Sequence, residues 1–364
     1  MKILKYVIGL LLAAIGLYIF FRGSGGGGES VYQALAGEIS RSSPITAAAC
    51  AALALFAMWL RALRLRVILP DTLPAPPLGA AASAIDIAVG RNAPHKGGLF
   101  SVTMVMAMLN NVLPIRAGEA ARVAILWKRN GFPIMVCVGS LLVEHALDIV
   151  VYLSFLFIPP IASPALLDKL RGLHPAMIAA IWLSAAAFAS LLGLFSLYAL
   201  LPRIFRGAAA NVGKYLPPKV RSAARKFGAE IESNLDWTAA PGKAAYVAAL
   251  TYAIALCYSA MLFILVYDIT PSGFINSLFS QAFAAFGAAI PLAPGSVGTL
   301  HAVLLQGMTI TGCPAPKARA VIVVYHAVQY VVVTGVGLLC LLAMKSKNKG
   351  KGGADDFFAR RPRP

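Results

Sequence analysis

Two carboxylates and a histidine lie inside an apolar segment, residues 134–158. Glu144 and Asp148 are four residues apart, so a helix places both on one face, with His145 beside them. A charge at the centre of a bilayer costs about 2.5–3.5 kcal/mol and is therefore usually paired or turned toward a cavity. The pattern predicts either a polar binding site within the membrane or a buried ion cluster that only holds helices together.

A second polar segment precedes the first, with the sequence NNVLPIRAGEAAR at 110–122. Pro114 ends one helix and Gly118 permits a tight turn, after which a new helix can begin with an acid in its first turn. Two arginines beside a helix N-terminus predict a phosphate seat, and they are also the nearest cations in sequence to the two acids. The alternative is an interfacial loop whose arginines reach toward water. The candidate residues are Asn110, Asn111, Arg116, Glu119 and Arg122.

A third segment combines helix breakers with histidine. Prolines and glycines between 291 and 298 cannot all occupy one regular helix, so the chain must open there. His301 follows near the start of the next helix, where it is a candidate titratable or phosphate-facing group, although a buried core histidine is the plainer interpretation. Residues 326, 329 and 330 share a later helical face and predict either a polar lining or ordinary packing. The candidates are Pro291, Pro294, Gly295, Gly298, His301, His326 and Gln329.

The elements that must position these residues are apolar runs long enough to cross a bilayer, about 20 residues each. The first run resembles a signal peptide, but no small-residue cleavage site follows it, so an uncleaved span is expected. Two further stretches, about 78–113 and 274–312, are interrupted by Gly, Pro and Asn, and each is expected to hold a pair of half-helices; kinked ordinary spans are the alternative. The six continuous runs are 3–21, 45–63, 134–158, 176–201, 244–268 and 320–344.

The two interrupted stretches share a Pro-x-x-x-Gly pattern, at 114–118 and 291–295. Transporters built from inverted repeats place broken helices at corresponding positions in their two halves. The sequence therefore predicts an all-α, polytopic integral membrane protein with about six full spans, two interrupted or re-entrant helix pairs and an inverted repeat. We expect one transmembrane domain over residues 1–344.

Composition supports the same class. Of 364 residues, 59% are hydrophobic and only 13% are charged, which excludes a water-soluble enzyme. The formal net charge of +18 lies in segments that flank apolar runs and is not interleaved with aromatic residues, so nucleic-acid binding is not expected. The five cysteines show no metal-ligand spacing. We expect no cofactor and no metal.

The distribution of basic residues predicts the orientation. If both termini are cytoplasmic, most of the 32 Lys and Arg residues lie inside, including the cluster Arg61, Arg64 and Arg66 and the whole segment 91–129. On this assignment 22–44 is an external Gly/Ser linker and 202–243 a basic cytoplasmic loop. The tail, 345–364, is expected to be disordered and to lie against anionic headgroups of the inner leaflet.

The ordered set of motifs resembles the transmembrane region of lysylphosphatidylglycerol synthases, which also occurs in free-standing flippase-like proteins. The resemblance rests on WLRALRLRVIL at 59–69, NNVLPIRAGEAAR at 110–122, Glu144 with Asp148, and PLAPGSVGTLH at 291–301. It implies lipid binding and movement of a lipid between leaflets. This chain departs from the family pattern in two places: His145 stands where many members have Arg, and His301 where many have Glu. Both changes put in doubt that the lipid is the same aminoacyl lipid.

These observations predict binding and transbilayer movement of a polar-headed, phosphate-bearing lipid in a bacterial inner membrane. The lipid is a phospholipid or an isoprenoid- or hopanoid-type lipid, and a lipid-synthesis enzyme is a candidate partner; the oligomeric state is left open. No soluble transferase domain follows residue 344, so we expect no lysyl transfer by this chain alone. Two alternatives stay open: a lipid-modifying enzyme with Glu144 or Asp148 as base and His301 as acid, and a non-catalytic scaffold.

Overall fold

The computed structural model describes Gly37 and residues 43–71, 95–114, 116–172, 233–267, 273–290 and 294–349. Every regular element in these ranges is a helix. The fold is therefore all-α, as predicted. The expected spans 3–21 and 176–201 lie outside the described residues, as do Pro291, most of the 22–44 and 202–243 loops, and most of the tail.

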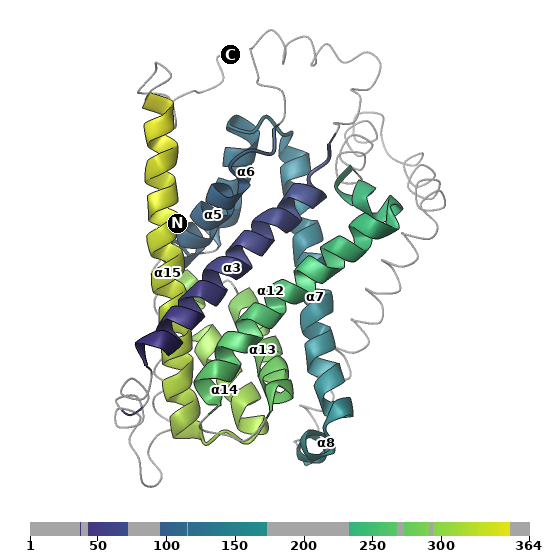
Figure 1. Cartoon of the computed structure of the whole chain (residues 1–364), viewed down its shortest axis with the longest axis vertical. Coiled ribbons are helices and arrows are strands. Elements are labelled where there is room, and N and C mark those ends of the chain that lie inside the picture. The colour runs from purple at the N-terminus through teal and green to yellow at the C-terminus, as the bar shows by residue number, and fades with distance from the viewer. Residues whose placement is uncertain are drawn as a thin grey trace, which may run out of the picture.

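Four long helices have the length and apolar composition needed to cross a membrane. They confirm four of the six predicted continuous runs, and most extend a few residues beyond the predicted bounds because their polar or proline-containing ends are also helical. They are α3 (Pro44–Ile68), α7 (Ile134–Ala162), α12 (Pro241–Val266) and α15 (Ala315–Lys349). The protein is thus a polytopic integral membrane protein (Figure 1).

Both predicted breaks are present, each between two short helices. The first pair is α5 (Leu99–Val112) and α6 (Ala117–Lys128). The second is α13 (Phe274–Ala289) and α14 (Thr299–Ile310), with the short turn η2 (Pro294–Ser296) between them. Fourteen residues of α-helix extend about 21 Å, too little for a full span. Each pair returns to the end of the molecule from which it enters, and the two pairs enter from opposite ends (Figure 1).

The position of the first pair corrects the sequence analysis, which placed it at 78–113. The two arms cover 99–112 and 117–128, and the break between them lies where the Pro-x-x-x-Gly pattern at 114–118 predicts it. Arg116 starts that arm in the left-handed region, with φ 49°. The second break is opened by Gly295 at φ 60° and Gly298 at φ 89°, conformations in which glycine carries no steric cost.

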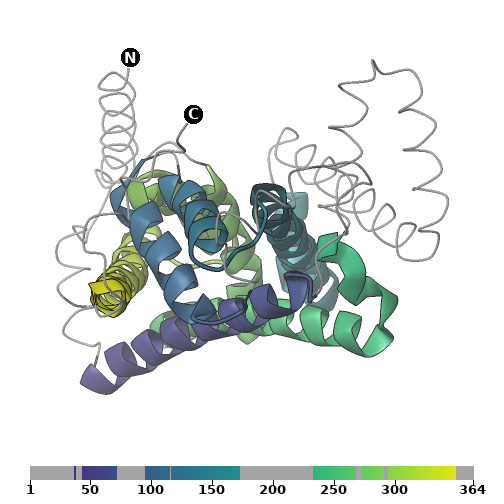
Figure 2. The ribbon, with the colours of Figure 1, turned by 90° about the horizontal axis from the view of Figure 1, so that it is seen from above.

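The element order is the same in both halves: a long helix, a broken pair and a second long helix. The first half is α3, α5–α6 and α7, and the second is α12, α13–α14 and α15. The two leading helices, α3 and α12, pack against each other along one side (Figure 2). Each broken pair packs against the second long helix of the other half: α5 packs against α15, and α13 packs against α7. This reciprocal packing is the arrangement that an inverted repeat produces.

Buried apolar side chains hold each broken pair in place. Leu304 of α14 packs with Ile322 and other residues of α15, and Leu126 of α6 packs with Val136 of α7. Two shorter helices, α8 (Pro164–Arg171) and η1 (Ser233–Ala239), lie at opposite ends of the molecule (Figure 1). The apolar core thus occupies both ends, and the polar residues gather where the broken pairs meet.

Candidate functional site

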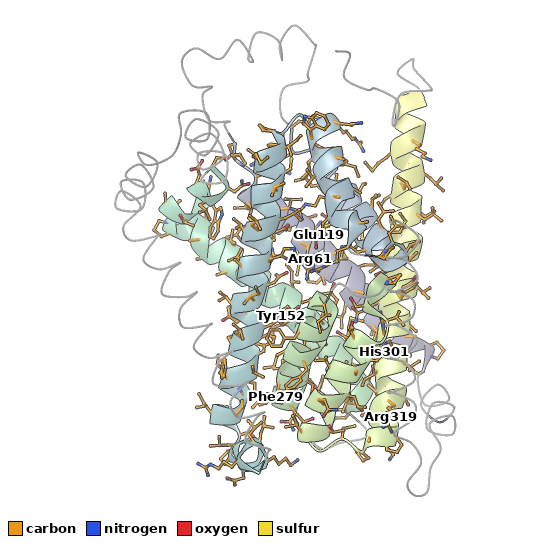
Figure 3. All side chains as sticks on the ribbon, turned by 180° about the vertical axis from the view of Figure 1, so that it is seen from behind. Arg61, Glu119, Tyr152, Phe279, His301 and Arg319 are labelled. Carbon is orange, nitrogen blue, oxygen red and sulfur yellow. The ribbon has the colours of Figure 1, made fainter. Side chains whose placement is uncertain are left out.

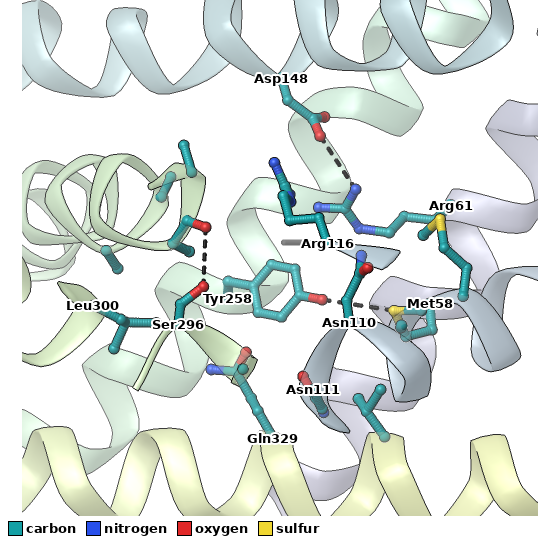
Figure 4. Close-up of a pocket in the computed structure, with 18 of the residues that line it drawn as sticks. Met58, Arg61, Asn110, Asn111, Arg116, Asp148, Tyr258, Ser296, Leu300 and Gln329 are labelled. Atoms are coloured by element: carbon teal, nitrogen blue, oxygen red, sulfur yellow. Dashed lines mark hydrogen bonds and ion pairs between the residues drawn. The ribbon is translucent and has the colours of Figure 1, made fainter. Parts of the chain in front are cut away.

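A cavity of about 430 Å³ lies between the breaks of the two helix pairs. Residues from α3, α5, α6, α7, α12, α13, η2, α14 and α15 line it (Figure 4). Arg61 and Glu119, which line the cavity and are labelled in Figure 3, lie about halfway along the molecule. The candidates from the sequence that line it are Asn110, Asn111, Arg116, Glu119, Arg122, Glu144, His145, Asp148, Gly295, His326 and Gln329.

The deepest ion pair joins α6 to α7. Arg122 Nη1 contacts Glu144 Oε2, and Arg122 Nη2 donates a hydrogen bond to Ser140 Oγ at 3.0 Å. A second guanidinium, Arg64 Nη2, lies 3.9 Å from Glu144 Oε1. Arg122 and Glu144 are 2% and 6% exposed, so their charges are compensated almost entirely by each other and by Arg64.

The second acid is held by the first long helix. Asp148 accepts hydrogen bonds from Arg64 Nη1 at 2.6 Å and Arg61 Nη1 at 3.2 Å. The sequence analysis assigned Arg61 and Arg64 to a cytoplasmic loop, and this was wrong: both lie within α3, and Arg64 is completely buried. Their spacing of three residues inside a helix that continues to Ile68 was the signal for an intramembrane pair.

A third ion pair stands at the break itself. Arg116 Nε lies 3.1 Å from Glu119 Oε1, and His145 Nε2 lies 3.3 Å from the same oxygen. Arg116 was expected to face Glu144 or Asp148, but its position at the start of α6 turns it toward Glu119 instead. Its side chain is 38% exposed, compared with 3% for Arg122. Arg116 is therefore the guanidinium most open to a molecule entering the cavity.

This cluster contains more arginine side chains than carboxylates. Four guanidiniums, of Arg61, Arg64, Arg116 and Arg122, stand against the carboxylates of Glu119, Glu144 and Asp148. With His145 neutral, one positive charge is left in excess. An excess cation in such a cavity attracts an anion, because low-dielectric walls weaken the screening of its field.

The opposite wall carries polar groups without formal charge. Tyr325 donates a hydrogen bond from its hydroxyl to Gln281 Oε1 at 2.8 Å. Tyr330 donates to the backbone carbonyl of Asn111 at 3.2 Å, and the Asn111 amide donates to Thr334 at 3.1 Å. These bonds tie the first break to α15. The shared face of residues 326, 329 and 330 was the sequence signal for this wall, whereas Gln281, a polar residue in an apolar helix, was a signal that the sequence analysis missed.

The histidines divide between the cavity and the structure around it. His326 lines the cavity, and the His301 ring lies behind it, with ring centroids 4.9 Å apart. His301 Nδ1 accepts a hydrogen bond from the Gly298 backbone N–H at 3.3 Å and so caps α14. Pro294, Gly298 and His301 shape the break, but none of them lines the cavity. The sequence analysis left His301 as either a phosphate-facing group or a buried core histidine; the structure buries it and gives it a capping position.

The described ranges hold no group of three or more metal-ligating side chains. The free cysteines are mostly buried and do not line the cavity. The arrangement is thus suited to binding an anion by guanidinium groups, with hydrogen-bonding side chains opposite them.

Gly118 lets α5 and α6 close together. A Cβ atom here would collide with the backbone carbonyl of Met106 and with Asn110. We expect Gly118→Ala to lower the free energy of unfolding by about 1–3 kcal/mol, because backbone must move to admit the methyl group. The matched control is Gly242→Ala, where a Cβ meets nothing within 4 Å. Denaturation in mixed micelles tests this, and equal stability of the two variants would contradict the close approach.

Comparison with known proteins gives one match. The family model described as the lysylphosphatidylglycerol synthase TM region matches residues 6–337. No curated protein and no solved structure matches the chain. The matched range contains every residue of the cavity described above.

Proposed function

The chain belongs to the lysylphosphatidylglycerol synthase transmembrane-region family, and we propose that it binds the phosphate of a lipid headgroup in the cavity and moves that lipid between the leaflets. The observation that carries the proposal is the excess guanidinium charge in a cavity halfway through the molecule. Arginine binds phosphate oxygens through two parallel N–H donors, which is why arginine pairs suit this ligand.

The two breaks supply the path. Helix pairs that enter from opposite ends bring irregular backbone to the middle of the molecule, where only protein or a polar cavity satisfies its hydrogen-bonding groups. A headgroup in the cavity is then within reach of both leaflets. Rocking one half against the other, as transporters with inverted repeats do, exposes such a site to each side in turn.

Competition for the arginines provides the switch. The carboxylates of Glu119, Glu144 and Asp148 pair with the four guanidiniums. A phosphate that binds the same arginines weakens these pairs. A ligand shifts a conformational equilibrium only through such differential contacts. Phosphate arrival thus favours a second arrangement of the helices that the ion pairs join.

Reconstitution tests the proposal. We expect purified protein in vesicles of phosphatidylcholine with a trace of fluorescent anionic phospholipid to raise the fraction of label accessible to dithionite from about one half toward the whole. Empty vesicles and vesicles with heat-denatured protein are the controls. If accessibility stays at the level of empty vesicles for every anionic phospholipid used, transport is not the function.

We also propose that both termini face the cytoplasm of a bacterial inner membrane. The end of the molecule at which α3 and α6 finish carries Lys96, Lys128, Arg129 and Lys243 (Figure 1). Lys96 donates to Asp71 at 2.7 Å, and this bond lowers the pKa of the Asp71 carboxyl, which stays ionised beside the cations. Basic residues are retained on the cytoplasmic side, and α15 finishes at the same end of the molecule (Figure 1).

Site-specific labelling checks this orientation. In a variant without the native cysteines, Arg171→Cys places a thiol at the α8 end and Lys243→Cys places one at the opposite end. Both native side chains are more than half exposed, so access is comparable. An impermeant maleimide added to intact spheroplasts should label position 171 at once, and position 243 only after permeabilisation. The reverse pattern would invert the topology.

A further inference from the structure

We infer that the cavity binds a proton on His145 together with the anionic lipid, so that the two bind cooperatively and a proton gradient drives the lipid toward the less acidic side. This inference rests on the proposed function and names its coupling ion. It starts from one oxygen at the first break. Glu119 Oε1 is shared by two groups, Arg116 Nε at 3.1 Å and His145 Nε2 at 3.3 Å.

The His145 imidazole is accessible from the cavity. Its side chain lines the α7 wall and is 39% exposed, compared with 8% for Glu144, one residue earlier. A proton therefore reaches the ring through the cavity without any of the buried ion pairs opening.

The charged groups around His145 are arginines and the carboxylates paired with them. Those in the lining are Arg61 on α3, Arg116, Glu119 and Arg122 on α6, and Glu144 and Asp148 on α7, with Arg64 of α3 buried behind them. α13 packs against α7 and has no charged or titratable side chain. The charges of α8 and η1, which also pack against α7, lie at the two ends of the molecule.

Histidine is the side chain whose charge changes between about pH 5 and 8, whereas arginine stays charged. Apart from the groups above, the titratable side chains of the lining are tyrosines on α7, α12 and α15, and His326 on α15. Of the lining residues in the described ranges, only the two histidines change charge near neutral pH.

The surroundings of the two histidines differ. The His326 ring lies beside the His301 ring, with centroids 4.9 Å apart, and makes no ion pair with a carboxylate among the described residues. A proton there would stand beside a second imidazole with no acid to compensate it. A proton on His145 instead lies next to the Glu119 carboxylate. His145 is therefore the proton site.

Protonation of His145 acts on the phosphate in two ways. It raises the excess of four guanidiniums over three carboxylates from one positive charge to two. It also compensates Glu119 from the α7 side, so that Arg116, which reaches into the lined space (Figure 4), is released to bind phosphate. Both effects tighten lipid binding. By thermodynamic reciprocity, lipid binding tightens proton binding by the same factor.

The affinity of the full chain in detergent for phosphatidylmethanol, measured against pH, tests this coupling. The phosphodiester of this lipid stays singly charged at about pH 5.5 and about pH 8, on either side of the histidine range. We expect the dissociation constant to be about tenfold smaller at the lower pH, a coupling of ordinary size. His145→Arg should bind at both pH values as tightly as the parent at low pH. His145→Gln should bind at both as weakly as the parent at high pH.

Two flat profiles at opposite levels would not arise from a merely structural histidine. His95→Gln is the control, because His95 is an exposed histidine outside the cavity and its loss should leave the parental pH dependence. Melting temperatures and size-exclusion profiles at both pH values show whether each variant is folded.

Vesicles with an acidic interior test the drive. A trace of fluorescent phosphatidylmethanol should accumulate in the outer leaflet, above its level in vesicles without a gradient, as measured by the fast phase of dithionite reduction. Nigericin, which collapses the gradient, should abolish the accumulation, and so should His145→Gln.

The outcomes separate the two proposals. The inference is overturned, while phosphate binding stands, by equal affinity at both pH values or by a pH dependence that survives in both His145 variants. It is also overturned if His326→Gln and not His145→Gln removes the pH dependence, or if transport ignores the gradient. If phosphatidylmethanol binds no better than uncharged diacylglycerol at either pH, the proposed function itself fails.

Discussion

Arg122→Ala should destabilise this protein more than any other single change in the cavity. Its removal leaves Glu144 with only the distant Arg64 contact at 3.9 Å, and it removes the hydrogen bond that Ser140 Oγ accepts from Arg122. Removing one partner of a buried ion pair costs about 3–5 kcal/mol, because the remaining charge is left uncompensated away from water. We expect a loss of that size in the free energy of unfolding, measured in mixed micelles, and little folded protein at growth temperature.

A second variant separates stability from binding. Arg122→Ala combined with Glu144→Gln removes both charges, so the uncompensated acid is gone and most of the stability should return. Anionic-lipid binding should not return fully, because one of the guanidiniums proposed to bind the phosphate is still missing. Arg66→Ala is the control, since Arg66 lies on the same helix as Arg64 but is exposed. A double variant that folds and moves lipid at the parental rate would show that Arg122 serves structure alone.

The breaks could be predicted from the sequence because proline and glycine act locally. Pro114 removes a backbone donor wherever it lies, and glycines at 295 and 298 permit positive φ without steric cost. The same reasoning extends to the long helices, where apolar length alone predicts a span. Both inferences need no knowledge of what the segment packs against, and both agree with the structure within the described residues.

The partners of the acids could be predicted only in part. Nearest cations in sequence pointed to Arg116 and Arg122, and Arg122 does pair with Glu144. Asp148, however, pairs with Arg61 and Arg64 of α3, more than eighty residues earlier. The counting of basic residues treats every arginine near the end of an apolar run as cytoplasmic, so it cannot tell a residue in the last turns of a helix from one in a loop. Only the packing of α3 against α7 and α12 shows that Arg61 and Arg64 face the acids from within a helix.

The histidine at 301 shows a related limit. Its position after a glycine-rich break suggested a ligand-facing group, yet its ring accepts a hydrogen bond from the backbone three residues earlier and caps α14. A residue at the N3 position of a helix can either cap the helix or face a ligand, and the sequence alone does not distinguish the two roles. His326, one helix later, is the histidine that reaches the cavity.

Arg116 and Glu119 should act on lipid binding with opposite signs. Arg116→Ala removes the most exposed guanidinium, and loss of a charge-assisted hydrogen bond of about 1.5–3 kcal/mol should weaken anionic-lipid binding roughly tenfold to hundredfold. Glu119→Gln removes the acid that competes for this arginine and raises the net positive charge of the cluster by one, so binding should tighten about tenfold. The dissociation constants of phosphatidylmethanol in detergent measure both changes.

A surface pair of the same geometry provides the control. Arg171 and Asp168 are also three residues apart and also 3.1 Å from each other, but both side chains are about 70% exposed at the α8 end. Asp168→Asn should leave lipid binding unchanged. Tighter binding in Glu119→Gln should slow the release of the lipid. The transport rate in vesicles should then fall although the affinity rises. This combination is expected if the Glu119 carboxylate competes with the lipid phosphate for Arg116 and so promotes its release. If Glu119→Gln binds and transports like the parent, the ion pair at the break does not compete with phosphate, and the switch must lie in the pairs of Glu144 and Asp148.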